Sequence, residues 1–305
     1  MVITVLLFFL FIGCFLLGMM WVRQGLAALS EQKMKRWMEN ITNRPVNGFM
    51  IGTLVTAVLQ SSSAVMVMTI GMVSAGILSF SQTIGIILGT NIGTTVTLEL
   101  LALPITNLTY VLVGGSIVLK MSRRTWVSSL GTLLFGLGMI FAAMTGFEWT
   151  ASLLFQQPFF SGLFEQMDHI SIAFLVGIVF TSLIQSSTAM TGIAIGFLNA
   201  EAITLEAGIS IMLGANIGTC VTAWLASIGG GREAKLTAYA HIWLNVIGGM
   251  AAIPFIEPLS VLCQILSDTS GTQLAHASVL YNLISSLIVL PFSIQFGQFI
   301  ERIHK

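Results

Sequence analysis

Long apolar runs follow one another along almost the whole chain. A run of about 20 apolar residues is the length that a helix needs to cross the hydrocarbon core of a membrane. Two further apolar stretches are interrupted by polar motifs near their middle, which favours helical hairpins. We predict spans at 1–22, 82–103, 106–121, 126–145, 207–228, 236–256 and 274–297, and hairpins at 46–78 and 170–199.

The composition restricts the class of protein. Apolar residues make up 55% of the 305 residues, charged residues 8%, and the mean hydropathy is +0.94. Backbone groups in lipid must be bonded internally, and the ten-residue alternation of a membrane β-barrel is absent from the sequence. We therefore predict an all-α polytopic membrane protein, whose first stretch, without a basic n-region, is retained as a span. Three separated cysteines suggest neither a disulfide framework nor a metal site.

The charges divide between the two faces when the predicted spans are crossed in turn. One face receives all basic side chains, and the other receives a group of acidic ones: Glu148, Glu165, Asp168, Glu201, Glu206, Glu257 and Asp268. Because basic residues mark the cytoplasmic side, we predict an external N-terminus and a cytoplasmic C-terminus in the plasma membrane. The basic side chains of that face are Arg23, Lys33, Lys35, Arg36, Arg44, Lys120, Arg123, Arg124, Arg232, Lys235, Arg302 and Lys305.

Two polar motifs occur twice, each displaced by 125 positions. Gln60-Ser61-Ser62-Ser63 returns as Gln185-Ser186-Ser187-Thr188, and Gly89-Thr90-Asn91-Ile92-Gly93-Thr94 returns as Gly214-Ala215-Asn216-Ile217-Gly218-Thr219. Residues 52–97 and 177–222 are identical at 19 of 46 positions without a gap. Duplicated polar residues at membrane depth indicate two half-sites of one binding centre.

The number of crossings between the two copies predicts their relative orientation. Three full crossings separate the first span from its counterpart, where Gly18-Met19-Met20 is echoed by Gly138-Met139-Ile140. An odd number inverts the second copy, whether each hairpin counts as zero or two crossings. We therefore predict a first repeat over 1–125, with a helix at 23–44 along the cytoplasmic interface, an inverted repeat over 126–256, and a final span with a cytoplasmic tail over 257–305.

The first duplicated motif predicts an anion site. About 14 residues precede Gln60 in its hairpin and reach roughly 21 Å as a helix, so the motif ends deep in the membrane. If Gln60 and Ser61 form the bend, the serines occupy a helix N-terminus, where free N–H groups and the positive dipole end favour an anion. The predicted anion ligands of the two copies are Ser61, Ser62, Ser63, Ser186, Ser187 and Thr188.

The second duplicated motif predicts a cation site in a broken span. Two glycines four positions apart loosen a helix, and local unwinding would free backbone carbonyls beside hydroxyl and amide oxygens that suit Na⁺. Cys220 replaces Thr95 in the second copy, which predicts a weaker or missing Na⁺ site there. The oxygens that we assign to sodium come from Asn91, Thr94, Thr95, Asn216 and Thr219. Small residues in membrane helices also serve close packing, which is the structural alternative for both motifs.

Other polar residues in the spans are candidates for lining the cavity. Thr56 and Thr181 are a further duplicated pair, and Glu99 is the one acidic side chain inside the predicted spans. Its place near the outer end favours a snorkelling or helix-bonded carboxylate over an ion ligand. Interhelical hydrogen bonds and cavity lining remain equal alternatives for His241, Asn245 and Asn282.

These motifs resemble those of the sodium-dependent phosphate cotransporter family, the type II group and its bacterial relatives. The resemblance rests on both Gln-Ser-Ser motifs, both Gly-x-Asn-Ile-Gly-Thr motifs and His241-x-x-x-Asn245, and it covers nearly the whole chain. It implies inorganic phosphate as the substrate and sodium as the coupling ion, with Gln60 and Gln185 among the sodium residues. No other cofactor and no nucleic acid is expected, and a homo-oligomer is left open.

An electrostatic argument supports sodium coupling. Hydrogenphosphate carries one to two negative charges, and burying an isolated ion is prohibitively expensive. Apart from Lys120 at the end of 106–121, no predicted span contains Lys or Arg. Two helix N-termini offer only about half a charge each, so cotransported cations must supply the rest. Alternating access by the two repeats is the expected mechanism.

Three rival functions remain open at this stage. The chain could carry another small anion such as a carboxylate or sulfate, act as a channel, or serve as a non-transporting scaffold. An enzyme is not expected, because no metal-ligand cluster, nucleophile with a base, or carboxylate pair converges in the sequence.

Overall fold

The computed structural model describes residues 1–39, 45–103 and 108–304, with side chains for all of these except 30–39. The described part is helical, as the apolar runs predict. The first half contains α1 (Val2–Glu39), α2 (Pro45–Leu59), α3 (Ser62–Ser74), α4 (Phe80–Leu101), α5 (Thr109–Lys120) and α6 (Thr125–Phe155). The second half contains α7 (Pro158–Met167), α8 (Ile170–Ile184), α9 (Ser187–Asn199), α10 (Leu205–Gly218), α11 (Cys220–Ala226), α12 (Gly231–Ala252), η2 (Ile253–Phe255), α13 (Ile256–Leu266), α14 (Ser270–Val289), η3 (Leu290–Phe292) and α15 (Ser293–Ile303).

Six helical stretches among the described residues are long and apolar enough to cross a membrane. They match six of the seven predicted spans within a few residues at their starts, and several run further. These stretches are Val2–Leu29, Phe80–Leu101, Thr125–Phe155, Leu205–Ala226, Gly231–Leu266 and Ser270–Ile303. The prediction of a multi-pass membrane protein is confirmed.

Two predicted elements differ from the structure. The span at 106–121 appears as the 12-residue α5, which reaches about 18 Å and is too short to cross a 30 Å core; residues 106 and 107 lie outside the described part. The prediction of a separate helix at 23–44 is wrong in one respect: the chain has no break after Val22, because α1 continues as one helix from Val2 to Glu39. Residues 40–44 lie outside the described part. No proline stands near Arg23, and Gly25 packs closely against Leu133 of α6, so helical hydrogen bonding continues through this region.

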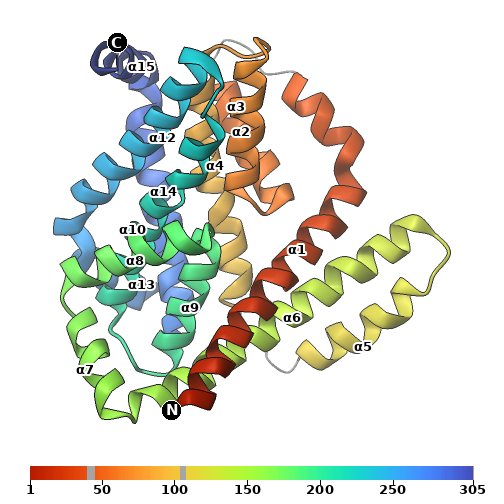
Figure 1. Ribbon diagram of the computed structural model, residues 1–305, viewed down its shortest axis with the longest axis vertical. Helices are drawn as coiled ribbons and strands as arrows, with labels where there is room; N and C mark the ends of the chain where they lie inside the picture. Colours follow the sequence, from red (N-terminus) through yellow and green to blue (C-terminus); the bar gives the residue numbers. More distant parts are fainter. Residues whose placement is uncertain (40–44, 104–107, 305) are drawn as a thin grey trace.

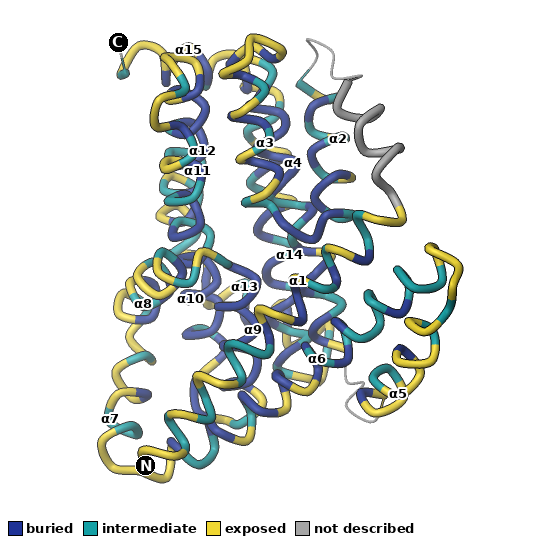
Figure 2. The backbone as a smooth tube through the Cα atoms, turned by 45° about the vertical axis from the view of Figure 1, so that its right-hand side comes forward, coloured by how far each residue is buried: buried dark blue, intermediate teal, exposed yellow. Residues whose placement is uncertain are grey.

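The helices are arranged so that the two predicted hairpins approach from different ends of the molecule. The chain termini lie at opposite ends, with α2 and α3 toward the end that carries the C-terminus and α7 toward the other (Figure 1). Helix α1 packs along α6, α2 along α4, and α8 along α10. The α5–α6 pair extends away from the other helices in both views (Figures 1 and 2).

The buried side chains form two cores that meet around the polar motifs. One core lies among α1, α6, α9 and α10, and contains Phe15 and Phe147; the other lies among α2, α3, α4 and α12, and contains Met66 and Ile87. Large apolar side chains such as Leu183 remain exposed, as contact with lipid favours.

The packing of α2 on α4 is repeated by α8 on α10 with the displacement of 125 residues. A Cβ atom at Gly52 would lie 2.6 Å from the carbonyl oxygen of Ile86, and one at Gly177 would clash with the carbonyl oxygen of Ile211. Helix backbones can approach this closely only where small residues face each other. The duplication in the sequence is therefore also a duplication of helix contacts.

Candidate functional site

The tips of the two hairpins have the same backbone geometry. Gln60 and Gln185 lie in the left-handed region, with φ of 52° and 57°, and end α2 and α8. The serine that follows each is extended and caps the next helix: Ser61 Oγ accepts from Ala64 N at 3.2 Å, and Ser186 Oγ accepts from Ala189 N at 3.3 Å.

Helices α3 and α9 thus begin two positions after the glutamines, at Ser62 and Ser187. The first N–H groups of a helix have no acceptor within it, so each tip presents donors and a positive dipole end. This is the local geometry that the Gln-Ser-Ser spacing favours.

A small cavity lies where the duplicated motifs meet. Its volume of about 10 Å³ is roughly the room of one water molecule, so a tetrahedral oxyanion enters only after the helices move. Three lining residues come from the first copy and three are their counterparts 125 positions later, while two come from α12. The lining residues are Ser62, Asn91, Thr94, Ser187, Asn216, Thr219, His241 and Asn245.

Amide side chains connect this cavity to α12. Asn91 Nδ2 donates to Asn245 Oδ1 at 3.4 Å, and Asn245 Nδ2 donates to the carbonyl oxygen of His241 at 2.9 Å. The Nδ1 atom of His241 is buried and has no partner among the described residues. The side-chain amide of Asn216 donates from Nδ2 to the sulfur of Met212 at 3.9 Å. The cavity therefore offers hydroxyl, amide and imidazole groups but no carboxylate.

The predicted unwinding of the second motif is wrong for the first copy, where α4 is continuous through Gly89, Asn91 and Gly93. In the second copy the helix is interrupted at Thr219, with φ of −64° and ψ of −23°, between α10 and α11. The glycines also serve close packing, since a Cβ at Gly93 would lie 2.6 Å from the carbonyl oxygen of Thr53. In the first copy, the carbonyl groups that unwinding would free for Na⁺ therefore stay within a continuous helix.

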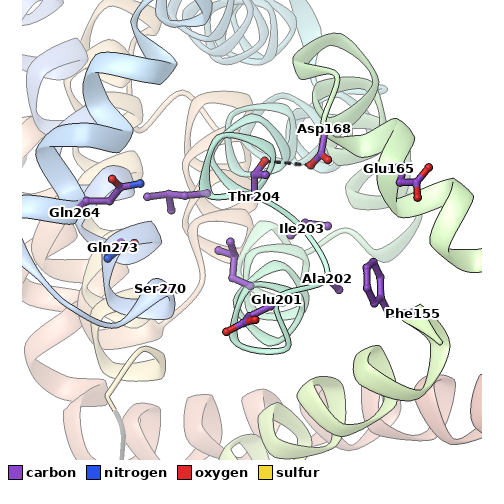
Figure 3. A pocket seen from close by; sticks show the side chains of 12 residues that line it. Phe155, Glu165, Asp168, Glu201, Ala202, Ile203, Thr204, Gln264, Ser270 and Gln273 are labelled. Carbon is purple, nitrogen blue, oxygen red and sulfur yellow. Dashed lines mark hydrogen bonds between the residues drawn. The ribbon is translucent and has the colours of Figure 1, made fainter.

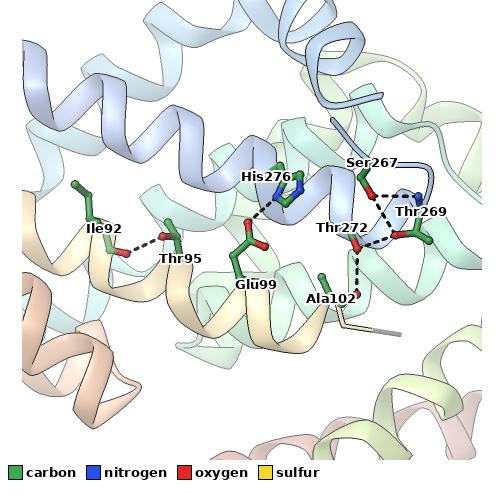
Figure 4. Close-up of polar contacts among 8 residues, drawn as sticks. All are labelled: Ile92, Thr95, Glu99, Ala102, Ser267, Thr269, Thr272 and His276. Atoms are coloured by element: carbon green, nitrogen blue, oxygen red, sulfur yellow. Dashed lines mark hydrogen bonds and ion pairs between the residues drawn. The ribbon is translucent and has the colours of Figure 1, made fainter. Parts of the chain in front are cut away.

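Several predicted ligands lie beside the cavity but do not line it. Thr95 Oγ1 donates to its own helix at Ile92 O, 2.8 Å away (Figure 4), and its counterpart Cys220 Sγ donates to Asn216 O at 3.5 Å. The remaining members of this group are Gln60, Ser61, Ser63, Gln185, Ser186 and Thr188.

Among the residues predicted as further cavity lining, only His241 and Asn245 do line it. Thr56 and Thr181 are fully buried, and each has a hydroxyl oxygen without a hydrogen-bond partner in the described structure. Asn282 Nδ2 donates to Ser278 O on its own helix at 2.8 Å.

Glu99 has a partner that the sequence did not indicate. Its Oε1 atom lies 2.8 Å from His276 Nδ1 on α14, and the two side chains are 35% and 30% exposed (Figure 4). The structure adds a partner to the expected snorkelling or helix-bonded carboxylate of Glu99, because α14 brings a ring nitrogen within reach. This pair links α4 to α14 outside the cavity.

Arg23 directly follows the predicted span 1–22 and turns toward the first hairpin. It belongs to the helical stretch Val2–Leu29, is half-buried, and its Nε donates to the carbonyl oxygen of Gln60 at 3.2 Å. Arg23 and Gln24 interrupt the apolar run, but the stretch as a whole stays apolar as far as Leu29. A guanidinium therefore lies beside a motif near which the sequence indicated none.

A second cavity of about 350 Å³ lies away from the duplicated motifs, between α7, the start of α10 and the α13–α14 connection (Figure 3). Glu165, Asp168 and Glu201 line it, and Thr204 Oγ1 donates to Asp168 Oδ1 at 3.2 Å. No basic side chain is among the lining residues, so this cavity repels an anion.

Comparison with known proteins assigns the chain to a family. The family described as Na⁺/Pi-cotransporter matches residues 14–148 and 153–267. The chain belongs to the Na⁺/Pi-cotransporter family. Both duplicated motifs and His241 lie within the matched residues, and the family resemblance stated from the motifs is confirmed.

Three relatives illustrate the range of similarity. The uncharacterized protein YqeW of Bacillus subtilis is 38% identical over 288 residues, which cover 94% of each chain. The "Putative inorganic phosphate export protein YjbB" of Salmonella typhimurium is 24% identical over 92% of this chain, which spans about half (52%) of that relative's length. The sodium-dependent phosphate transport protein 2A of Ovis aries is 48% identical over 63 residues, 21% of this chain and 10% of its own. No solved structure is significantly similar to the chain.

Proposed function

We propose that this member of the Na⁺/Pi-cotransporter family is a secondary active transporter that couples inorganic phosphate to sodium ions by alternating access. The cavity between the two motif copies carries the proposal, because three of its residues recur as their counterparts 125 positions later. Two equivalent half-sites at one cavity are what a two-repeat transporter requires.

The anion half-sites of this proposal are the two capped helix starts. Ser62 and Ser187 line the cavity from α3 and α9, and the N–H groups beside them have no acceptor within their helices. Ser61, Ser63, Ser186 and Thr188 complete the proposed phosphate ligands after the small helix movement that the closed cavity calls for.

The sodium ligands of this proposal are side-chain oxygens, because the continuity of α4 removes the carbonyl ligands expected from unwinding in the first copy. Asn91, Thr94, Asn216 and Thr219 line the cavity, and the buried amide oxygen of Gln60 has no donor among the described residues. Thr95 and Gln185 are proposed as supporting members of these sites.

The orientation and the inversion of the repeats belong to the same proposal. The approach of the two hairpins from different ends supports inverted copies (Figure 1). The distribution of basic residues supports an external N-terminus and a cytoplasmic C-terminus. Inversion lets each half-site open to a different side of the membrane. Assembly into a homo-oligomer is compatible with this arrangement.

Uptake of radiolabelled phosphate into proteoliposomes tests the proposal. An inward Na⁺ gradient should drive uptake in the wild type, and Ser62→Ala and Ser187→Ala should abolish it. The control Ser161→Ala, at a partly exposed position of α7 outside the cavity lining, should not change it. Undiminished uptake by both cavity variants would contradict the site, and competition by sulfate or a carboxylate would identify another anion as the substrate.

The name of the relative YjbB, a putative inorganic phosphate export protein, supports an alternative to sodium-driven uptake, in which phosphate leaves the cell. A sodium symporter imports phosphate under an inward Na⁺ gradient, whereas an exporter must release it against or without that gradient. Efflux from phosphate-loaded vesicles in sodium-free medium, at the rate seen with Na⁺ present on both sides, would favour the exporter over the symporter.

A further inference from the structure

One basic side chain reaches the tip of the first hairpin from a neighbouring helix. Arg23 on α1 donates through Nε to the carbonyl oxygen of Gln60 at 3.2 Å. Gln60 is only 7% exposed and precedes Ser61, the cap of α3. The guanidinium therefore lies within a few ångströms of the helix N-terminus that we propose as an anion half-site.

Arg23 has no counter-ion among the described side chains. Among all described side chains, the one pair of opposite charges within 4.0 Å is His276 with Glu99, and this pair does not include Arg23. A half-buried cation without a carboxylate is costly, and charged residues at membrane depth mark ion pathways. The neutral carbonyl group of Gln60 does not balance the full charge of Arg23. The position of Arg23 therefore favours an anion that binds reversibly beside it.

The surroundings of Gln60 contain a second group that lacks a partner. Its amide nitrogen donates to Ala57 O at 2.5 Å, while its buried Oε1 has no donor in the described structure. A carbonyl-type oxygen is a suitable Na⁺ ligand and an unsuitable anion ligand. The first hairpin tip thus combines a fixed cation, free helix N–H groups and an unused oxygen, which suits an anion next to a sodium ion.

The second hairpin tip has the same backbone but no such charge. Gln185 is exposed, and no side chain from α6 bonds its carbonyl oxygen among the described residues. Arg23 stands five positions after Gly18, and the position five after the echoing Gly138 is Ala143, which is fully buried. The fixed positive charge is therefore a feature of the first copy alone.

We propose that Arg23 is the fixed positive charge of the first anion half-site, balancing part of the charge of hydrogenphosphate bound at the N-terminus of α3. The proposal rests on the phosphate transport proposed above. It assigns Arg23 an electrostatic role through space, so the charge matters more than the shape of the guanidinium. It also makes the two half-sites unequal in their affinity for the anion.

Binding measurements on the purified full chain separate this role from a structural one. Phosphate affinity is measured at saturating Na⁺, and Na⁺ affinity is measured in phosphate-free medium, for the wild type, Arg23→Gln, Arg23→Lys and the control Arg124→Gln, an exposed position at the α5–α6 turn. Removing a unit charge at short range should weaken phosphate binding by about tenfold or more in Arg23→Gln. Arg23→Lys should stay within about threefold of the wild type, since it keeps the charge.

The sodium measurement gives an expectation of opposite sign. Loss of a nearby positive charge should leave Na⁺ affinity unchanged or raise it, whereas a hairpin that loses a structural tether would lose affinity for both ions. Weakening of both ions by Arg23→Gln and Arg23→Lys alike would overturn the electrostatic role. Equal phosphate affinity in the wild type and Arg23→Gln would overturn it while leaving the proposed transport intact.

Two further outcomes are also decisive. A wild type that binds no phosphate overturns the proposed function and this inference together. If Arg23→Gln does not fold, Arg23→His tests the charge within one protein, because its phosphate affinity relative to wild type should fall as the pH rises through the usual histidine range of about 6.5. A ratio that does not change with pH would contradict the proposal.

Discussion

Gly89 faces the backbone of α2 so closely that a methyl group in its place has no room. A Cβ atom there would overlap the carbonyl oxygen of Phe49 and lie 2.7 Å from Thr53 N. Both neighbours are backbone atoms within α2, so they cannot rotate away as a side chain would. Gly89→Ala must therefore push α2 and α4 apart at the level of the cavity.

The magnitude follows from two opposing effects. Replacing glycine by alanine in a helix interior gains about 1 kcal/mol from propensity, and overpacking costs about 1–3 kcal/mol. Gly71→Ala on α3 is the matched control, because no atom lies within 4 Å of its Cβ position and only the gain applies. The two variants should therefore differ by about 1–3 kcal/mol in stability, with Gly89→Ala the lower.

Thermal unfolding of the detergent-purified variants measures this difference. At about 2–4 °C per kcal/mol, Gly89→Ala should melt roughly 2–12 °C below Gly71→Ala. Gly214→Ala in the second copy should behave like Gly89→Ala, since its Cβ would overlap Phe174 O. A Gly89→Ala protein as stable as the control but inactive in phosphate uptake would refute close packing as the role of this glycine and restore helix unwinding.

Three other predictions concern polar side chains in the cavity lining and elsewhere. Thr56→Val and Thr181→Val should leave the melting temperature unchanged or raise it, because they remove buried hydroxyls without partners; a fall of several degrees would show an interaction not seen here. Asn245→Leu should abolish phosphate uptake while the protein still elutes as a folded species, since it removes an amide that lines the cavity. A double-mutant cycle of Glu99→Gln and His276→Gln should give a coupling of about 0–1 kcal/mol, because both side chains are about one-third exposed; coupling well above this range would indicate a desolvated pair.

Much of the fold follows from hydrophobic patterning. Spans were predicted because lipid requires long apolar helices, and this constraint acts on each segment separately. The duplication in the sequence extends to the packing of helices. The contacts of α2 with α4 recur between α8 and α10 at the same displacement of 125 residues. The short length of α5 was missed because hydropathy reports how apolar a segment is and does not report where its helix begins and ends.

The members of the site were easier to predict than their chemistry. Asn91 and Asn216 meet at one cavity as the paired motifs indicated, yet the glycines beside them pack helices and do not loosen them. Glycine allows both close approach and flexibility, and the sequence alone does not say which is used. The presence of a second helix backbone within contact distance decides it.

The two charged contacts were missed for a different reason. Arg23 was placed on the cytoplasmic face because the first predicted span ended at Val22 and alternating crossings gave that face all basic residues. Whether it turns inward depends on how α1 lies against the tip at Gln60, 37 positions away along the chain. His276 and Glu99 are 177 positions apart, and no local pattern connects them.

The unequal hairpin tips change what sodium must supply. Two helix N-termini contribute about half a positive charge each, and Arg23 adds a full charge on one side only. An anion at the first tip is then close to balanced, whereas at the second tip, where Gln185 is exposed and Ala143 takes the place of arginine, it depends more on cations. If Na⁺ makes up this difference, phosphate bound from the side of the second hairpin must show the steeper dependence on sodium concentration, and Arg23→Gln must remove the contrast between the two sides.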